Sequence, residues 1–185
     1  ELMRQQLFNH PEGYSKDYQP GFKFRGLDDT GIFFDDNHER LTQNYRNSYM
    51  RLALSYLNSG NNKMVISTLN EMEEQLPREV VPMDYRLLHD VGRIYYRAGS
   101  LERYMDIAEK VEEEALARIE RNPRSFNDPY YNPYQMLLEI YENTGEFDKA
   151  INVVKDLKEF FPQDPQLDQL MQQYQTMAAQ QDTAN

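Results

Sequence analysis

The chain has 185 residues and a formal net charge of −11, so nucleic acid or an anionic membrane face would repel it. It contains no cysteine, which excludes disulfides, thiolate catalysis and zinc–thiolate sites. Apolar residues make up 39% and charged residues 28%, a mixture that favours a solvated helical array over a thick globular core. No segment is apolar over the length of a membrane span. Because the chain begins at Glu1 and not at an initiator Met, we expect it to be a piece of a longer protein.

Residues 1–37 form a segment that glycine and proline interrupt repeatedly. This spacing allows short turns or extended segments but no long helix. The segment also has too many aromatic side chains for a disordered linker. We therefore expect an arm that folds against the first helical pair and shields its open end. The aromatic residues of this arm are Tyr14, Tyr18, Phe22, Phe24, Phe33 and Phe34.

The rest of the chain predicts helices. Asn37 or Asp36 is a suitable cap for a helix over 38–58, whose apolar residues recur every three or four positions. The apolar face of this helix comprises Leu41, Tyr45, Tyr49, Leu52, Ala53 and Tyr56. Further helices are predicted over 62–76, 83–98, 101–121, 132–143, 147–161 and 165–179, and residues 181–185 as a disordered tail.

Three glycines organise these helices into pairs. Gly60, Gly99 and Gly145 each follow a tyrosine by four positions, and the glycines are 39 and 46 residues apart. Periods of this length indicate stacked helical repeats. In each repeat, glycine allows the turn between the two helices, and the aromatic ring packs between them.

This pattern resembles the tetratricopeptide repeat. The matching residues of the unit 46–77 include Tyr49, Leu52, Ala53, Tyr56, Gly60, Val65, Leu69 and Pro77. Those of the unit 131–162 include Tyr134, Leu137, Leu138, Tyr141, Gly145, Phe147, Ala150, Val154 and Pro162. The unit 85–122 departs at Tyr104 and Leu116, so its second helix continues toward Asn122. The resemblance implies an all-α, right-handed α-solenoid of three helical pairs over 38–180, with a C-terminal capping helix over 165–179.

A narrower resemblance covers nearly the whole chain. The run from Phe24 to Leu27, the run Asn44-Tyr45-Arg46, and the later Pro82 and Tyr85 carry it. These runs resemble the C-terminal soluble tail of bacterial polytopic membrane proteins similar to protein O-mannosyltransferases. The resemblance implies a tail on the outer side of the membrane, without the catalytic body. A cytoplasmic location stays open on sequence grounds.

Acidic residues crowd the end of the arm. Oxygen ligands in this number can hold a divalent cation, but their spacing lacks the pattern of an EF-hand loop. We favour an acidic turn followed by a helix N-terminus, where carboxylates interact well with the helix dipole. The residues concerned are Asp28, Asp29, Asp35, Asp36, Asn37, His38 and Glu39.

Catalysis by this chain is not expected. His10, His38 and His89 include no helical pair for a metal, and no serine lies in a nucleophile-elbow pattern. No glycine loop that holds phosphate is present either. We expect no cofactor, no metal and no catalytic residue.

The first helix of each repeat should present one face to a shared groove. Arginines on the middle repeat make a local basic stripe, which suits a carboxylate-bearing peptide. Plain pairing of the same arginines with acidic neighbours such as Asp90 is the simpler interpretation, and a surface role is the simpler one for His89. The candidate partner-binding residues are Met50, Arg51, Leu54, Arg86, His89, Arg93, Arg97, Met136 and Glu139.

An insert over 123–134 carries Phe126, Tyr130 and Tyr131. A tyrosine-rich loop can be a recognition surface. Filling of the gap beside the longer preceding helix is the interpretation that we favour.

The sequence thus predicts a non-catalytic scaffold for a protein or peptide partner, with no nucleic acid and with a membrane only through a parent chain. The first alternative is a free-standing repeat adaptor in the periplasm or cytoplasm. The second is a sugar-handling enzyme that uses the acidic arm. Nothing in the sequence fixes the partner or the oligomeric state.

Overall fold

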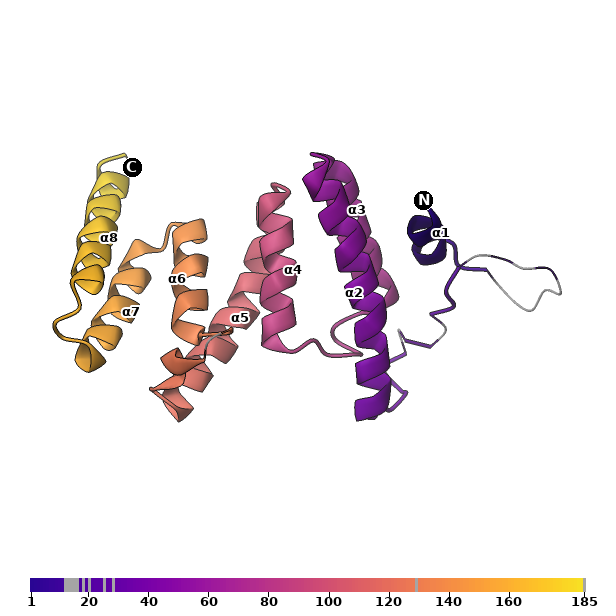
Figure 1. Cartoon of the computed structure of the whole chain (residues 1–185), viewed down its shortest axis with the longest axis horizontal. Helices are drawn as coiled ribbons and strands as arrows, with labels where there is room; N and C mark the ends of the chain where they lie inside the picture. Colours follow the sequence, from indigo (N-terminus) through magenta and orange to yellow (C-terminus); the bar gives the residue numbers. More distant parts are fainter. Residues whose placement is uncertain are drawn as a thin grey trace. The chain divides into compact units, whose positions relative to one another are not determined.

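The computed structural model describes residues 1–11, 17, 19, 21–24, 26–27, 29–128 and 130–184 (Figure 1). These residues form α-helices, one short 3-10 helix and no β-strand, which confirms the all-α class. The chain divides into two compact units, Glu1–Tyr104 and Met105–Asn185. The first unit contains α1 (Leu2–Phe8), α2 (Asp36–Asn58), α3 (Asn62–Gln75), α4 (Tyr85–Arg97) and the start of α5 (Leu101–Arg121). The second contains the rest of α5, η1 (Ser125–Asn127), α6 (Pro133–Thr144), α7 (Phe147–Phe160) and α8 (Pro165–Ala184).

Most helix ends lie within two residues of the predicted ones. The main differences are the N-cap of α2 and the C-terminal end of α8. The N-cap of α2 is Asp35, not Asn37 or Asp36, because its carboxylate accepts the N–H groups of Asn37 and His38. At the other end, α8 extends through Ala184, so residues 181–184 are helical where we expected a disordered tail. The segment after 179 begins with two glutamines and has no glycine or proline to stop a helix. Residue 185 lies outside the described residues.

The three glycine turns are nearly identical. Gly60, Gly99 and Gly145 have φ values of 72°, 83° and 75°, the left-handed region that glycine adopts without steric cost. After each glycine, the next N–H donates to the carbonyl of the repeated tyrosine. These bonds are 2.9 Å at Asn61, 3.0 Å at Ser100 and 2.9 Å at Glu146. This is the 6→1 bond of a Schellman motif, which ends one helix and turns the chain toward the next.

The second helices of the first and third repeats are also alike. α3 and α7 each have 14 residues, and each is followed by one capping residue and then by a proline. Proline cannot continue a helix, so Pro77 and Pro162 fix these ends. The middle repeat has no proline at this place, and α5 continues to Arg121 as predicted.

The core of the first unit lies along the seam of α2 and α3. Tyr49 and Ala53 on α2 are buried against neighbours on α3 that are buried as well. Leu41, however, is 58% exposed, although its spacing places it on the same stripe. α2 is longer than α3 by 23 to 14 residues, and its N-terminal end extends past α3 (Figure 1). The first turns of α2 therefore lack the helix that covers the rest of the stripe.

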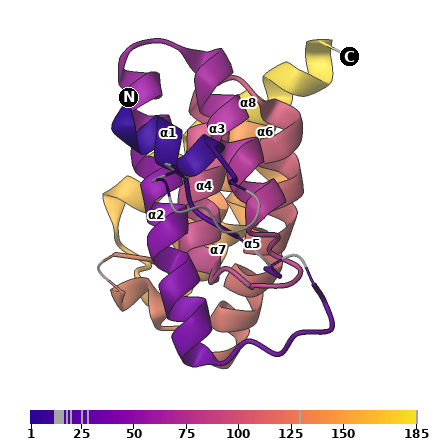
Figure 2. The same ribbon diagram turned by 90° about the vertical axis from the view of Figure 1, so that its right-hand side faces the viewer.

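The described part of the arm packs on α2 and α3. α1 lies across α2 (Figure 2), and the hydroxyl of Tyr49 donates to the Leu7 carbonyl at 2.8 Å. The rings of Phe22 and Phe24 meet Tyr45 edge-on at 5.0 and 5.3 Å. His10 Nε2 lies 2.7 Å from a carboxylate oxygen of Glu71 on α3. Tyr14 and Tyr18 lie outside the described residues.

Three tyrosines, the repeated Tyr95 and Tyr141 and also Tyr174 on α8, link their helices to an earlier helix of the same unit. Tyr95 donates to Asn70 on α3 at 2.9 Å, and Tyr141 donates to Glu112 on α5 at 2.8 Å. Tyr174 on α8 donates to Glu142 on α6. All three rings are buried, and each hydroxyl finds an acceptor at the edge of the core. The first member of the predicted series, Tyr56, is only half-buried.

A buried arginine fixes the connection between α3 and α4. Arg46 on α2 is 0% exposed, and its guanidinium donates to the carbonyls of Leu76 and Pro82 at 3.1 Å each, and also to that of Val81. These carbonyls belong to the segment that leads into α4. A buried carbonyl that loses its partner costs free energy, so Arg46 stabilises this connection more than a surface arginine would.

We expect Arg46→Met to lower the free energy of unfolding by on the order of 3 kcal/mol, because buried carbonyls lose their donors. Urea unfolding followed by circular dichroism measures this loss. Arg51→Met, one and a half turns along the same helix at an exposed position, is the matched control and should change stability by less than about 0.5 kcal/mol. Equal stabilities of the two variants would contradict the role of Arg46.

Candidate functional site

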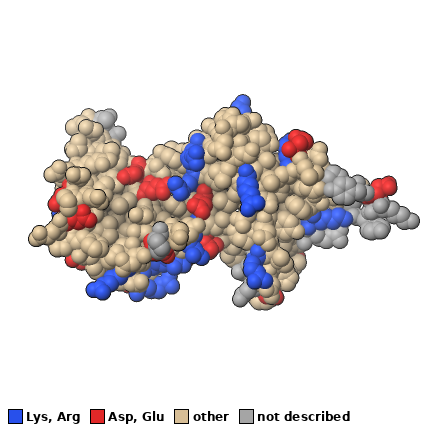
Figure 3. Space-filling view, viewed as in Figure 1, with Lys and Arg blue, Asp and Glu red and all other residues tan. Residues whose placement is uncertain are grey.

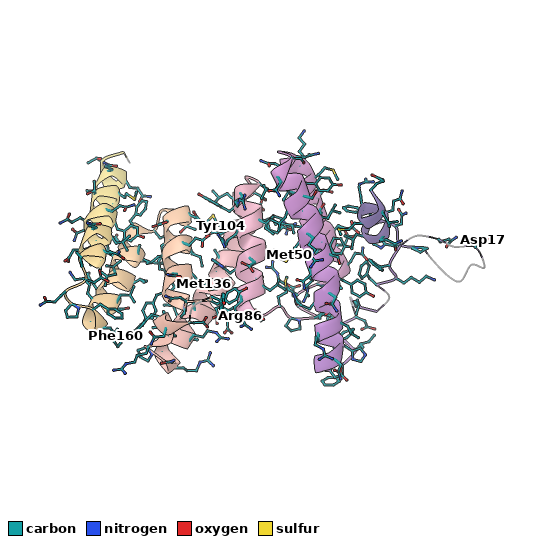
Figure 4. The ribbon with its side chains drawn as sticks, in the orientation of Figure 1. Asp17, Met50, Arg86, Tyr104, Met136 and Phe160 are labelled. Atoms are coloured by element: carbon teal, nitrogen blue, oxygen red, sulfur yellow. The ribbon has the colours of Figure 1, made fainter. Side chains whose placement is uncertain are left out.

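The candidate residues of the first unit lie on two neighbouring helices, α2 and α4, which contact each other. Met50, Arg51 and Leu54 are on α2, and Figure 4 shows Met50 beside that helix. Arg51 is exposed, Met50 is half-buried, and Leu54 is 36% exposed. These side chains lie opposite the stripe that α2 buries against α3, as expected for a helix with one buried face.

On α4, three of the four candidates reach solvent. Arg86, Arg93 and Arg97 are exposed, and Figure 4 places Arg86 near the start of the helix. The guanidinium of Arg86 lies 3.3 Å from Asp84, the residue that caps α4 through the N–H groups of positions 86 and 87. Arg93 also has polar interactions. The arginine stripe predicted from sequence is therefore present and open to solvent.

The fourth candidate on α4, His89, is only 7% exposed. The expectation of a surface histidine in an open groove is therefore wrong for this residue. α4 buries Tyr85, Leu88, Val91, Gly92, Ile94 and Tyr95 as well. The buried arc of this helix is wider than one stripe, so a side chain next to Leu88 is covered too.

Tyr96 completes the open surface of α4, and the sequence analysis did not single it out. Its ring is 40% exposed and lies 5.0 Å from the ring of Tyr104. Its neighbour Tyr95 is the tyrosine of the repeat pattern, and that pattern gives no indication of the exposure of Tyr96. We call the surface made by Met50, Arg51, Leu54, Arg86, Arg93, Tyr96 and Arg97 the α2–α4 face.

The two remaining candidates, Met136 and Glu139, are on α6 in the second unit. Met136 is 4% exposed, so it is part of the core of that unit and cannot contact a ligand without rearrangement. It lies next to Leu137 in a helix that buries six of its residues. Glu139 is half-buried and has polar interactions.

Lys149, Glu112 and Glu146 form a group of charged residues in the second unit. Lys149 lies 3.0 Å from Glu112 and 2.7 Å from Glu146, and its ammonium is 5.3 Å from the centre of the Tyr141 ring. The hydrogen bond from Lys149 lowers the pKa of the Glu146 carboxyl, and the same bond raises the pKa of Lys149. Both groups thus stay charged near neutral pH. Neither is prepared to transfer a proton.

The acidic stretch of the arm serves as a helix start. Asp35 Oδ1 accepts two backbone N–H groups and lies 2.7 Å from His38 Nδ1. The N–H of His38 holds the pKa of the Asp35 carboxyl below its usual value. In the part of the chain that the structure describes, no three acidic or histidine residues gather as metal ligands. Asp28 and the side chains of Asp36 and Glu39 lie outside the described residues.

A cavity of about 490 Å³ lies between the arm and the first turns of α2. Phe22, Leu27, Leu41 and Tyr45 give it apolar walls, and Thr42 is among its polar lining residues. The apolar stripe of α2 did not predict this cavity, because the sequence does not show that the first turns of α2 extend past α3.

The insert before α6 packs on the second unit. The ring of Phe126 lies 5.2 Å from Phe160, 5.0 Å from Phe161 and 6.1 Å from Tyr134. These contacts favour the space-filling interpretation for Phe126. Tyr130, in contrast, is exposed, and residue 129 lies outside the described residues.

Comparison of the chain with protein-family models, curated proteins and solved structures gave no match. Among the helices of the described ranges, none combines the length and hydropathy that a bilayer crossing requires. The assignment of a role therefore depends on the residues themselves.

The buried tyrosines make a pH dependence testable. Burial raises the pKa of Tyr49, Tyr95, Tyr141 and Tyr174 well above the usual value of 10.0. Above pH 10 the unfolded chain loses these protons while the folded chain keeps them. Stability should therefore be constant in this respect below pH 10 and fall above it, by about 1.4 kcal/mol per pH unit for each tyrosine. Urea unfolding between about pH 8 and pH 11 measures the slope.

Tyr95→Phe should remove the contribution of one tyrosine from that slope, because this group no longer titrates. Tyr130→Phe changes an exposed tyrosine and should leave the slope unchanged. A flat profile above pH 10 would show that the hydroxyls titrate as they do in the unfolded chain.

Proposed function

We propose that this chain is a non-catalytic, tetratricopeptide-like interaction domain that binds a protein or peptide partner on the α2–α4 face. The observation that carries the proposal is the openness of this face on two neighbouring helices, with Arg51, Leu54, Arg93 and Arg97 all reaching solvent. α2 and α4 bury their other sides in the core, so the side chains of this face are held in fixed positions. Rigid presentation lowers the entropy cost of binding a partner.

The repeat character supports the proposal. The three glycine turns have the same left-handed φ and the same 6→1 hydrogen bond, and α3 and α7 match in length and in their ends. In repeat proteins of this kind, side chains of the first helices often form the binding surface. The paired charges around Lys149 support a role without catalysis, because these groups hold their protonation states.

We also propose that the domain is the extracytoplasmic tail of a glycosyltransferase-like membrane protein. Two residues of the resemblance contact each other, since Arg46 of the run Asn44-Tyr45-Arg46 donates to the carbonyl of Pro82. In that setting the domain would hold a partner or substrate protein near the membrane-embedded body. A free-standing adaptor would use the same face.

The binding role is tested by panning a phage-displayed random peptide library on the immobilised chain. We expect enrichment of peptides whose affinity falls at least tenfold on Leu54→Asp, because a charge replaces an apolar contact on the α2–α4 face. Leu116→Asp, which changes an exposed leucine on α5, is the matched control and should bind normally. Failure to enrich any peptide, or equal binding by both variants, would refute the role.

The membrane setting has a separate test. The complete gene upstream of Glu1 should encode several apolar spans of about 20 residues each. An initiator Met directly before Glu1, or an upstream region without such spans, would leave the free-standing adaptor as the better description.

A further inference from the structure

We propose that the α2–α4 face takes an acidic segment of the partner protein, with an apolar side chain between the acidic ones. This inference rests on the binding role proposed above and names the chemistry of the partner. It starts from an uneven distribution of charge. From Arg40 to the end of α2, and throughout α4, the chain has six arginines and a single acidic residue, Asp90. These two stretches carry a formal charge of +5 in a chain whose net charge is −11.

The structure leaves most of this positive charge at the surface. Of the six arginines, only Arg46 is buried, where it binds backbone carbonyls. Arg51 and Arg97 are exposed and have no hydrogen-bond or ion-pair partner among the described residues. Arg86 pairs with Asp84 at 3.3 Å, and both side chains are about half exposed, so water weakens this pair. Figure 3 shows the blue side chains over both helices.

Guanidinium groups favour carboxylates as ligands, because the planar fork of N–H donors fits the two carboxylate oxygens. An acidic side chain near Arg51 and another near Arg97 would each gain a charge-assisted hydrogen bond. Such bonds contribute more than bonds between neutral groups.

Apolar surface lies on the same face as these charges. Leu54 is one turn beyond Arg51 on α2, and the partly exposed ring of Tyr96 adjoins Arg97 on α4. Both side chains expose apolar area to water in the free chain. An apolar side chain of the partner that covers them would stabilise the complex. Because the face combines arginines with apolar surface, it favours an acidic segment that contains an apolar residue over a purely acidic one.

The charge of the remaining chain favours a peptide over a nucleic acid. Outside the two basic stretches the chain has a formal charge of −16, which would repel an extended polyanion that reaches past the face. A short acidic segment can stay within the basic area. At physiological salt, exposed charges interact over about 8 Å, so a short segment on this face is affected mainly by the charges of α2 and α4.

The probe for the test is a synthetic peptide of about ten residues in which glutamates surround one leucine and one tyrosine, labelled with fluorescein. Its C-terminus is amidated, so that only side-chain carboxylates are available. Fluorescence anisotropy at low and physiological salt measures its affinity for the intact chain. We expect saturable binding that weakens as salt rises, and no binding of the same peptide with lysines in place of glutamates.

The double variant Arg51→Glu with Arg97→Glu should weaken binding of the acidic peptide at least tenfold. Arg121→Glu with Arg124→Glu makes the same change of net charge at exposed arginines elsewhere and should bind like the natural chain. Melting curves from circular dichroism verify that both double variants fold. Unchanged binding by the first double variant, or equal loss in both, would overturn the proposal.

Two further results separate this inference from the binding role. If panning selects Leu54-dependent peptides that lack acidic residues, the binding role holds and the acidic class is wrong. If a fluorescein-labelled single-stranded oligonucleotide binds at physiological salt more tightly than the acidic peptide, and the same two arginines are needed, the ligand class is wrong as well.

Discussion

The left-handed turn at three glycines is the constraint on which the architecture depends. A residue with a side chain pays a steric penalty at φ values of 72° to 83°, and glycine does not. Each turn ends one helix with the same hydrogen bond and starts the next within two or three residues. The tyrosine four positions before the glycine supplies the carbonyl of that bond. The same residue therefore ends its helix through the backbone and, at Tyr95 and Tyr141, anchors the core through its ring and hydroxyl.

The charges of the chain are distributed unevenly, which its net charge of −11 does not show. One buried arginine, Arg46, holds the segment between α3 and α4 through backbone carbonyls, whereas Arg51, five residues later, is exposed. Five residues turn a helix by about one and a half turns, so neighbours of the same type lie on opposite sides. The opposite placement gives one arginine a structural role and leaves the other available to a partner. The exposed arginines place positive charge on α2 and α4 of an otherwise acidic chain.

The charged groups around Lys149 hold their protonation states, for an electrostatic reason. The titratable groups that come closest together, such as Lys149 with Glu112 and Glu146, are opposite charges that stabilise each other in the charged form. General acid–base catalysis needs a group whose pKa lies near the working pH. At the start of α2, the carboxylate of Asp35 accepts hydrogen bonds from backbone N–H groups. The surface that stays open, the α2–α4 face, consists of side chains suited to recognition.

The sequence by itself determined the helices, the turns and the tyrosines of the core, because these depend on local periodicity and on the backbone freedom of glycine. It also identified the arginines of α4, since helical spacing alone places positions 86, 93 and 97 on one side. Only the tertiary structure decided how far each face is covered. His89 and Met136 are buried and Leu41 is exposed, against the pattern in each case, because burial depends on where a neighbouring helix begins and ends. The separate roles of Arg46 and Arg51, and the open ring of Tyr96, follow from the same cause: they are set by contacts between segments far apart in the chain.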